Sequence, residues 1–131
     1  MVEGSKNFEI TNFSKAARVP RAAFLGIKDA ALGKNYSLSL VFINEKGMQE
    51  LNRERRGKDY PTDILSFSLN KNTGEIFICP TVTQKKSKEF GRTYPNYLTY
   101  LFIHGCMHLK GFDHSATMER HENKLRKKFN I

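Results

Sequence analysis

Three of the four histidines in this 131-residue chain lie within eleven consecutive residues. His104 and His108 are four residues apart, a spacing that places both imidazoles on one face of a helix. A glycine at position 111 can adopt the left-handed conformation that often ends a helix, so the chain can turn back and bring His114 to the same point. Three imidazoles around one point, with a fourth position open, are typical of a catalytic zinc site. The spacing therefore predicts a metal bound by these three histidines.

Two other residues near this cluster are assigned different roles. Cys106 lies two positions from each helical histidine, on the opposite face of the helix, which indicates a small buried residue rather than a ligand. His121 stands between Arg120 and Glu122 in a basic segment and is interpreted as a surface residue.

The spacing H-x-x-x-H-x-x-G-x-x-H is also that of metzincin proteases, which carry a glutamate directly after the first histidine as general base. In this chain that position is Gly105, which cannot accept a proton. The motif is thus zincin-like in its three histidines but lacks the acid–base residue of the proteases, which indicates a different substrate.

A second group of residues suited to chemistry begins at Arg53. Four cations, Arg53, Arg55, Arg56 and Lys58, fall within six residues, in what the sequence predicts to be a polar loop ending at Asp59. Such a run is commonly a solvated charged turn. Beside a divalent metal, however, arginines suit a phosphodiester, because the guanidinium fork matches two phosphate oxygens.

The elements that position these residues follow from hydrophobic periodicity. Alternation predicts four strands, the last two forming a hairpin, at residues 8–12, 36–43, 64–69 and 75–79. Helices are expected from Phe13 through Ala16 and Ala17 to Ala31, behind an N-cap at Asn44, and over residues 81–90, 96–110 and 117–129. This order indicates an α+β domain with one mixed sheet of about four strands packed against helices.

Length and composition limit the class of protein. A chain of 131 residues fits one domain, residues 1–131, with an adequate core and no need of disulfides. No apolar run approaches the ~20 residues that span a bilayer, and the first residues lack an apolar signal stretch. With only Cys79 and Cys106, the chain is expected to be cytoplasmic, with reduced thiols and no membrane partner. The net charge of +9 fits an acidic partner such as nucleic acid or a ribosome, and equally a generally basic proteome.

Together, these segments resemble the signatures of the YbeY family of bacterial single-strand-specific endoribonucleases and ribosome maturation factors. The family pattern L-N-x-x-x-R-x-K-D-x-P-T-D-V-L-S-F corresponds to residues 51–67, and H-G-x-x-H-L-x-G-x-D-H corresponds to residues 104–114. A weaker G-D-I signature appears at residues 74–76, with Glu75 in place of aspartate.

The resemblance implies one zinc ion per chain, bound by His104, His108 and His114, and an RNA-cleaving role for Arg56. It also implies work on ribosomal RNA, including maturation of the 3′ end of the small-subunit RNA and quality control of ribosomes. The zinc would act as a Lewis acid and lower the pKa of its bound water, and Arg56 would neutralise charge in the transition state.

Single-stranded or ribosomal RNA is expected in a groove where Arg53 and Lys58 guide the backbone. Two further basic clusters would extend this groove, at residues 85, 86 and 88 and at residues 124, 126, 127 and 128. The cluster at 124–128 could equally be the solvated face of a terminal helix. Tyr60 and Tyr94 are candidate stacking surfaces for bases.

The proton acceptor has several candidates. Asp113, next to a predicted ligand, would be a base or a partner for an imidazole N–H. Asp59 and Asp63 are alternatives, and either water or the RNA 2′-hydroxyl could attack. The family often has a glutamate and a histidine seven and four residues before the first ligand, where this chain has Tyr97 and Tyr100.

Two other functions compete with RNA cleavage. One is a metal-dependent peptidase or other hydrolase, which the glycine at position 105 and the basic composition disfavour. The other is a non-catalytic ribosome-assembly factor in which zinc only stabilises the fold.

Overall fold

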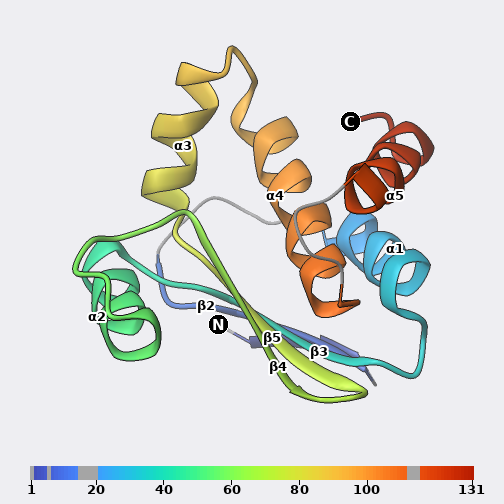
Figure 1. The fold of residues 1–131 in the computed structure, drawn as a ribbon, viewed down its shortest axis with the longest axis horizontal. Coiled ribbons are helices and arrows are strands. Elements are labelled where there is room, and N and C mark those ends of the chain that lie inside the picture. Colours follow the sequence, from blue (N-terminus) through green and yellow to red (C-terminus); the bar gives the residue numbers. More distant parts are fainter. Residues whose placement is uncertain (1, 6, 15–20, 112–115) are drawn as a thin grey trace.

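The computed structural model describes residues 2–5, 7–14, 21–111 and 116–131, which form one mixed sheet and the helices around it (Figure 1). The elements in chain order are β1 (Val2–Ser5), β2 (Phe8–Asn12), α1 (Arg21–Leu32), β3 (Ser37–Phe42), α2 (Glu45–Arg56), β4 (Ile64–Asn70), β5 (Thr73–Ile78), α3 (Pro80–Glu89), α4 (Tyr94–Leu109) and α5 (Ala116–Lys128). The strands lie in the order β1-β2-β3-β5-β4. The three central strands are parallel, and the outer pairs β1–β2 and β4–β5 are antiparallel.

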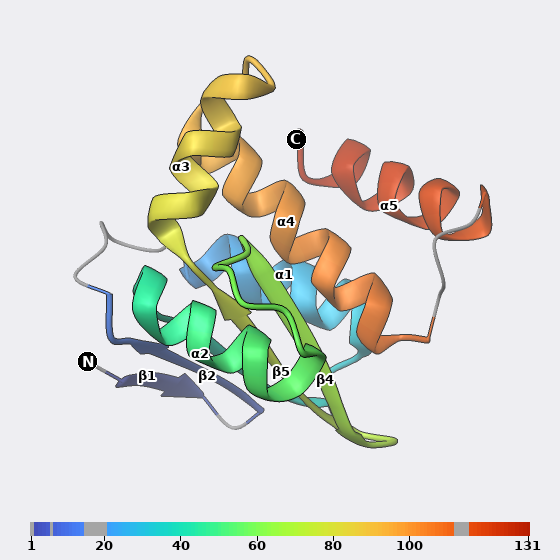
Figure 2. The same cartoon turned by 60° about the vertical axis from the view of Figure 1, so that its left-hand side comes forward.

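Alternation along β4 and β5 divides the helices between the two faces of the sheet. Leu65 and Phe77 face α2 and pack with its Met48 in a small apolar cluster. Ile76 and Ile78 point to the opposite face and join the main core with α1 and α4. α4 crosses this second face, in contact with α1, α3, α5 and β4, while α2 lies on the first (Figure 2).

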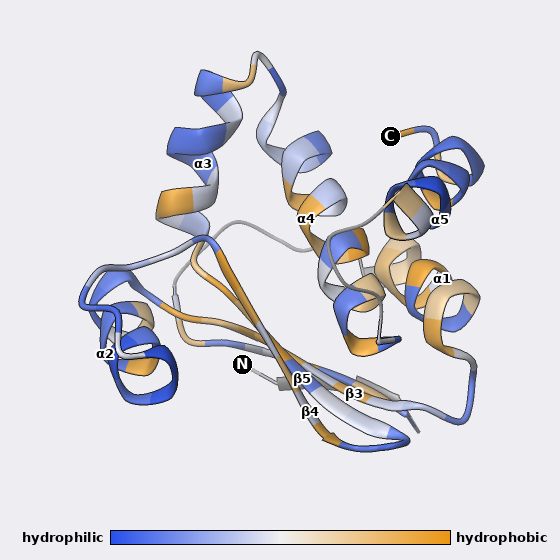
Figure 3. Ribbon diagram, viewed as in Figure 1, coloured by the Kyte–Doolittle hydropathy of each residue, from blue (hydrophilic) through white to orange (hydrophobic). Residues whose placement is uncertain are grey.

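The main core fixes α4 on the sheet. Phe102 of α4 stacks on Phe24 of α1 with ring centroids 4.5 Å apart, and the ring of Phe8 in β2 lies 6.0 Å away. All three side chains are at most 1% exposed. Hydrophilic residues predominate along α3 and α5 (Figure 3), and no helix among the described residues is long and apolar enough to cross a membrane.

The α+β class and the mixed sheet are confirmed, and the predicted strands and the three C-terminal helices lie within two residues of their expected bounds. The sheet nevertheless has one strand more than expected. The sequence does not indicate β1, because Val-Glu-Gly-Ser has neither alternation nor an apolar run, yet it pairs with the edge of β2.

The first predicted helix begins later than expected. Phe13 precedes it, is 69% exposed, and donates its N–H to the carbonyl of Phe42, whereas α1 starts at Arg21. Ala16 and Ala17 lie outside the described residues.

Candidate functional site

Two histidines converge at the C-terminal end of α4. His104 and His108 lie one turn apart, with their Nε2 atoms 3.0 Å from each other. Their ring centroids are 4.6 Å apart, and the ring planes meet at 85°. α4 ends at Leu109, and Gly111 has a φ of +98°, the left-handed conformation that the sequence predicts. The described part of the site thus brings two imidazole nitrogens to one point.

A buried glutamate orients the first histidine. The Glu122 carboxylate of α5 accepts a hydrogen bond from Nδ1 of His104, and its side chain is nearly inaccessible, the residue being 7% exposed. Since a carboxylate accepts hydrogen bonds, this contact favours the neutral tautomer of His104 with the proton on Nδ1 and the lone pair on Nε2, on the side of His108. Sequence reasoning missed this residue. The available signal was its position on the buried stripe of α5 between Met118 and Leu125, where a carboxylate requires a partner.

The other predicted site residues of the C-terminal motif divide into two groups. His114 and Asp113 lie outside the described residues, so the third ligand and the base stay predictions. Within the described residues, no group of three His, Cys, Asp or Glu side chains could hold a metal. Cys106 is fully buried, burial raises the pKa of its thiol, and it is a core residue as predicted. His121 is exposed, also as predicted.

The glycine between the two histidines allows α4 to lie directly on the sheet. A Cβ atom at Gly105 would be 2.9 Å from Cδ1 of Ile64, 3.0 Å from Oγ of Ser66 and 3.1 Å from Cδ1 of Ile76. A glutamate at this position, as in the metzincins, would collide with β4 and β5. Gly105 therefore has a packing role in addition to lacking an acid–base group.

A cavity of about 470 Å³ joins the histidine pair to the basic segment. Its lining includes Arg56, the first five residues of β4, His104, Gly105 and His108. The Arg56 side chain is exposed, and β4 forms the wall between it and α4. Two segments about fifty residues apart in sequence thus meet at one cavity, as the combination of the two motifs predicts.

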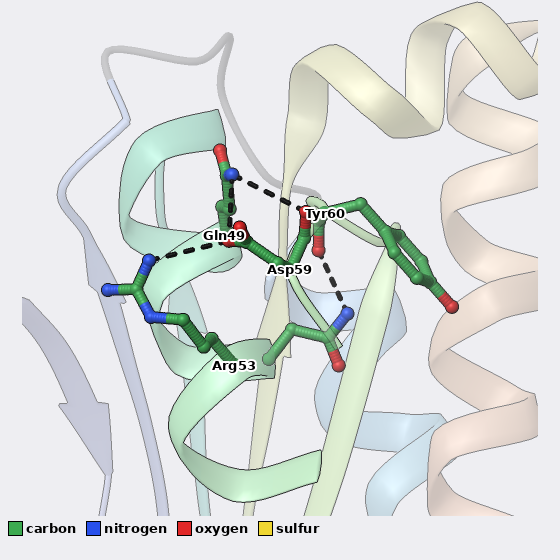
Figure 4. A network of polar contacts seen from close by, with 5 residues as sticks. Gln49, Arg53, Asp59 and Tyr60 are labelled. Atoms are coloured by element: carbon green, nitrogen blue, oxygen red, sulfur yellow. Dashed lines mark hydrogen bonds and ion pairs between the residues drawn. The ribbon is translucent and has the colours of Figure 1, made fainter. Parts of the chain in front are cut away.

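The first part of the basic segment is helical, which corrects the predicted loop for residues 53–56, whereas residues 57–59 lie in a loop as predicted. α2 continues to Arg56, and the left-handed Gly57 ends it. The chain then folds back on the helix (Figure 4): Arg53 Nη1 lies 3.4 Å from the Asp59 carboxylate, which also accepts a 3.0 Å hydrogen bond from Gln49. The sequence pattern misleads here because arginine favours helices almost as well as alanine does.

The remaining residues of this segment differ in burial. Lys58 is exposed, and neither it nor Arg53 belongs to the described lining of the cavity. Asn52 is fully buried and donates a 2.9 Å hydrogen bond to the carbonyl of Tyr60. Its amide therefore holds the returning chain against α2, a role that sequence reasoning did not assign.

Asp63 ties β4 to the helices α3 and α4. Its carboxylate accepts a 3.3 Å hydrogen bond from the Tyr97 hydroxyl and lies 3.3 Å from Nζ of Lys86. Burial, together with the charge of Asp63, raises the pKa of Tyr97. Both alternative bases are thus engaged in other contacts, Asp59 with Arg53 and Asp63 with Tyr97.

The outlying residues predicted to contact RNA are not equally available. Tyr60 is 49% exposed, whereas Tyr94 is half-buried against the main core, and burial raises its pKa. Lys85 lies 3.3 Å from the carboxylate of Glu45, and the basic residues of α5 at 124, 127 and 128 are exposed.

Similarity to known proteins extends over the whole fold. Residues 3–130 match the sequence model of a family described as Endoribonuclease YbeY. A protein of that name from Neisseria meningitidis is 37% identical over 123 residues, 82% of this chain and 72% of the relative. One from Campylobacter jejuni is 38% identical over 118 residues, 84% of this chain and 82% of the relative.

Other matches cover less of the relative or are structural. A protein of the same name from Bdellovibrio bacteriovorus is 46% identical over 82 residues, 61% of this chain, and the match spans 55% of the relative's length. The solution structure of a Thermotoga maritima protein superimposes with a TM-score of 0.66 and 27% identity, covering 93% of this chain and 88% of that one.

Proposed function

This chain belongs to the Endoribonuclease YbeY family, and on that premise we propose that it is a metal-dependent endoribonuclease that cleaves single-stranded RNA. We assign it to ribosomal RNA processing in the cytoplasm, with maturation of the 3′ end of small-subunit RNA and ribosome quality control as its roles. The two buried free cysteines fit such a reducing compartment.

The observation that carries the proposal is the cavity shared by Arg56 and the histidine pair. A guanidinium group fits two oxygens of a phosphodiester, and its positive charge would stabilise the negative charge that increases in the transition state. Arg53 and Lys58, on either side of the α2 C-terminus, would guide the RNA backbone toward this cavity.

The proposal includes one zinc ion, bound by His104, His108 and His114. The described donors fit such an ion. The Nε2 atoms of His104 and His108 lie 3.0 Å apart, and the hydrogen bond between Glu122 and Nδ1 of His104 leaves the lone pair on Nε2 of His104 available for the metal. Imidazoles suit zinc or a neighbouring transition metal. When bound, the ion would polarise a phosphoryl oxygen and acidify a coordinated water. Asp113 would accept a proton or hold an imidazole N–H.

The central test is the variant Arg56→Ala. We expect it to keep its fold and its metal but to lose cleavage, with kcat falling by about 10²–10³-fold, since one charge-stabilising donor is removed. Cleavage of an end-labelled single-stranded ribosomal RNA measures kcat, and atomic absorption of the purified protein measures metal content.

Arg55→Ala is the matched control. It removes the same charge one residue earlier on α2, where the guanidinium lies 4.9 Å from the centroid of the Phe67 ring and outside the described cavity lining. Its kcat should stay close to that of the wild type. Full activity of Arg56→Ala would defeat the assignment, and a wild type that hydrolyses peptides but not RNA would favour another hydrolase.

A further inference from the structure

Two arginines from different parts of the chain contact one tyrosine ring beside the histidine pair. Tyr100 lies one turn before His104 on α4, and its ring centroid is 6.4 Å from that of His104. The guanidinium carbon of Arg92 lies 5.0 Å from the Tyr100 centroid, and that of Arg126 lies 5.1 Å from it. Both distances are within the range of cation–π attraction.

The charge of these two arginines is not neutralised within the described residues. Arg92 donates a 2.7 Å hydrogen bond to the Asn96 amide oxygen, and Arg126 donates a 3.4 Å hydrogen bond to that of Asn123. Both partners are neutral amides, and no described carboxylate lies within ion-pair distance of either guanidinium. Nε of Arg126 is buried without an acceptor. An anionic oxygen would supply what these donors lack.

Tyr100 and Arg126 line a second cavity, of about 510 Å³, together with residues that include His104 and Asn123. Arg92 is outside this lining and contacts the site through the ring of Tyr100. His104 is the one described residue that it shares with the cavity containing Arg56. Two glutamates also line it: Glu122, which is engaged with His104, and the exposed Glu119, whose charge water screens. A strand cleaved at the histidines would therefore extend into both cavities.

We propose that Arg92, Tyr100 and Arg126 form a second RNA subsite, which binds a backbone phosphate on the flank of the cleaved bond that Arg56 does not reach. This inference rests on the proposed function and adds a ligand-binding role for residues outside the two sequence motifs. A phosphate contact on this flank would add affinity, because affinity for RNA comes largely from phosphate neutralisation.

Tyr100 is the positioning residue of this subsite. Cation–π contact with one rigid ring restricts both guanidinium groups before RNA binds, which lowers the entropy lost on binding. Tyr100→Phe keeps the ring and should behave like the wild type. Tyr100→Leu removes the ring and should raise KM while leaving kcat and metal content unchanged.

The decisive experiment compares wild type with the double variant Arg92→Gln/Arg126→Gln. We expect KM for a single-stranded RNA to rise by about tenfold with kcat unchanged. Fluorescence anisotropy with a labelled RNA should show a salt slope, log Kd against log salt, that is smaller by about 0.7, the value for one lost phosphate contact on a single strand. An RNA shortened on the flank that reaches the subsite should bind wild type and the double variant equally. An RNA shortened on the opposite flank should still show the difference in KM and salt slope between the two proteins.

Arg120→Gln is the control for Arg126, because it removes one charge from the same helix, α5, at an exposed position outside both described linings. If the double variant has the KM and salt slope of this control, the subsite is refuted, even though Arg56→Ala remains inactive. If wild type cleaves no RNA, the nuclease assignment fails, whatever the result for the subsite. The subsite can then still be tested by RNA binding, and a salt slope unchanged in the double variant would refute it.

Discussion

The orientation of a single imidazole depends on a residue from another helix. Glu122 holds Nδ1 of His104, so the nitrogen that faces His108 is the one with a lone pair. The spacing of the histidines predicts the pair, because residues four apart share a helix face. It cannot predict Glu122, because contact between α4 and α5 depends on tertiary packing across 18 residues.

Glu122→Gln should weaken metal binding by about 10–100-fold while leaving the fold intact, because the neutral amide holds the imidazole less strongly than a carboxylate does. Competition with a chromophoric chelator measures the affinity, and circular dichroism checks the fold. Glu119→Gln is the control, since this exposed glutamate lies one turn earlier on α5. Equal affinities for the two variants would show that the carboxylate does not orient His104.

Among the helices and strands, hydrophobic periodicity predicts those whose apolar residues pack against the core. It misses a helical turn that consists of charged residues. The alternating residues of β3 and β5 identify these strands because one face of each is more deeply buried than the other. β4 also alternates in sequence, although Leu65 is its one buried residue. The last turn of α2 is missed because its arginines resemble a solvated loop, although the glycine after it is a good helix stop. That turn places Arg56 at the cavity, so the predicted loop is wrong at this position, while the catalytic role of Arg56 stays a prediction.

The close approach of α4 to β4 gives a prediction for Gly105. Gly105→Ala should lower the free energy of unfolding by about 1 kcal/mol, because overpacking costs about 1–3 kcal/mol and alanine regains about 1 kcal/mol of helix propensity. Urea titration followed by circular dichroism measures the change. Gly47→Ala in α2 is the control, because the nearest atom would be 3.3 Å away and overpacking is milder. The same gain in helix propensity should there raise the free energy of unfolding, by up to about 1 kcal/mol. A Gly105→Ala protein as stable as wild type would mean that α4 does not pack this tightly.

For the molecule as a whole, the core and the site are built from different faces of the same elements. The main core draws on β2, β3, β5, α1, α4 and α5, and it contains neither His104 nor His108. The apolar residues that hold α4 in place therefore do not depend on a metal. We expect such a separation in an enzyme that uses a metal cofactor, and not in a protein whose fold requires the ion.

Removal of the metal should consequently abolish RNA cleavage without unfolding the protein. After chelation we expect the far-ultraviolet circular dichroism spectrum to be retained, with a cooperative thermal transition at a lower Tm because the ion stabilises the native state by mass action. Activity should return when zinc is added. Loss of the helical signal on chelation would instead support the non-catalytic factor stabilised by zinc.

The contact between α4 and α5 also has a consequence for biosynthesis. α5 is translated after every other described element, so a ribosome that stalls before it releases a chain with the histidine pair and Arg56 but without Glu122 and Arg126. Such an interrupted chain would lack the carboxylate that aligns its first imidazole. On the proposed function, the first imidazole would be aligned for metal binding only after α5 has been synthesised.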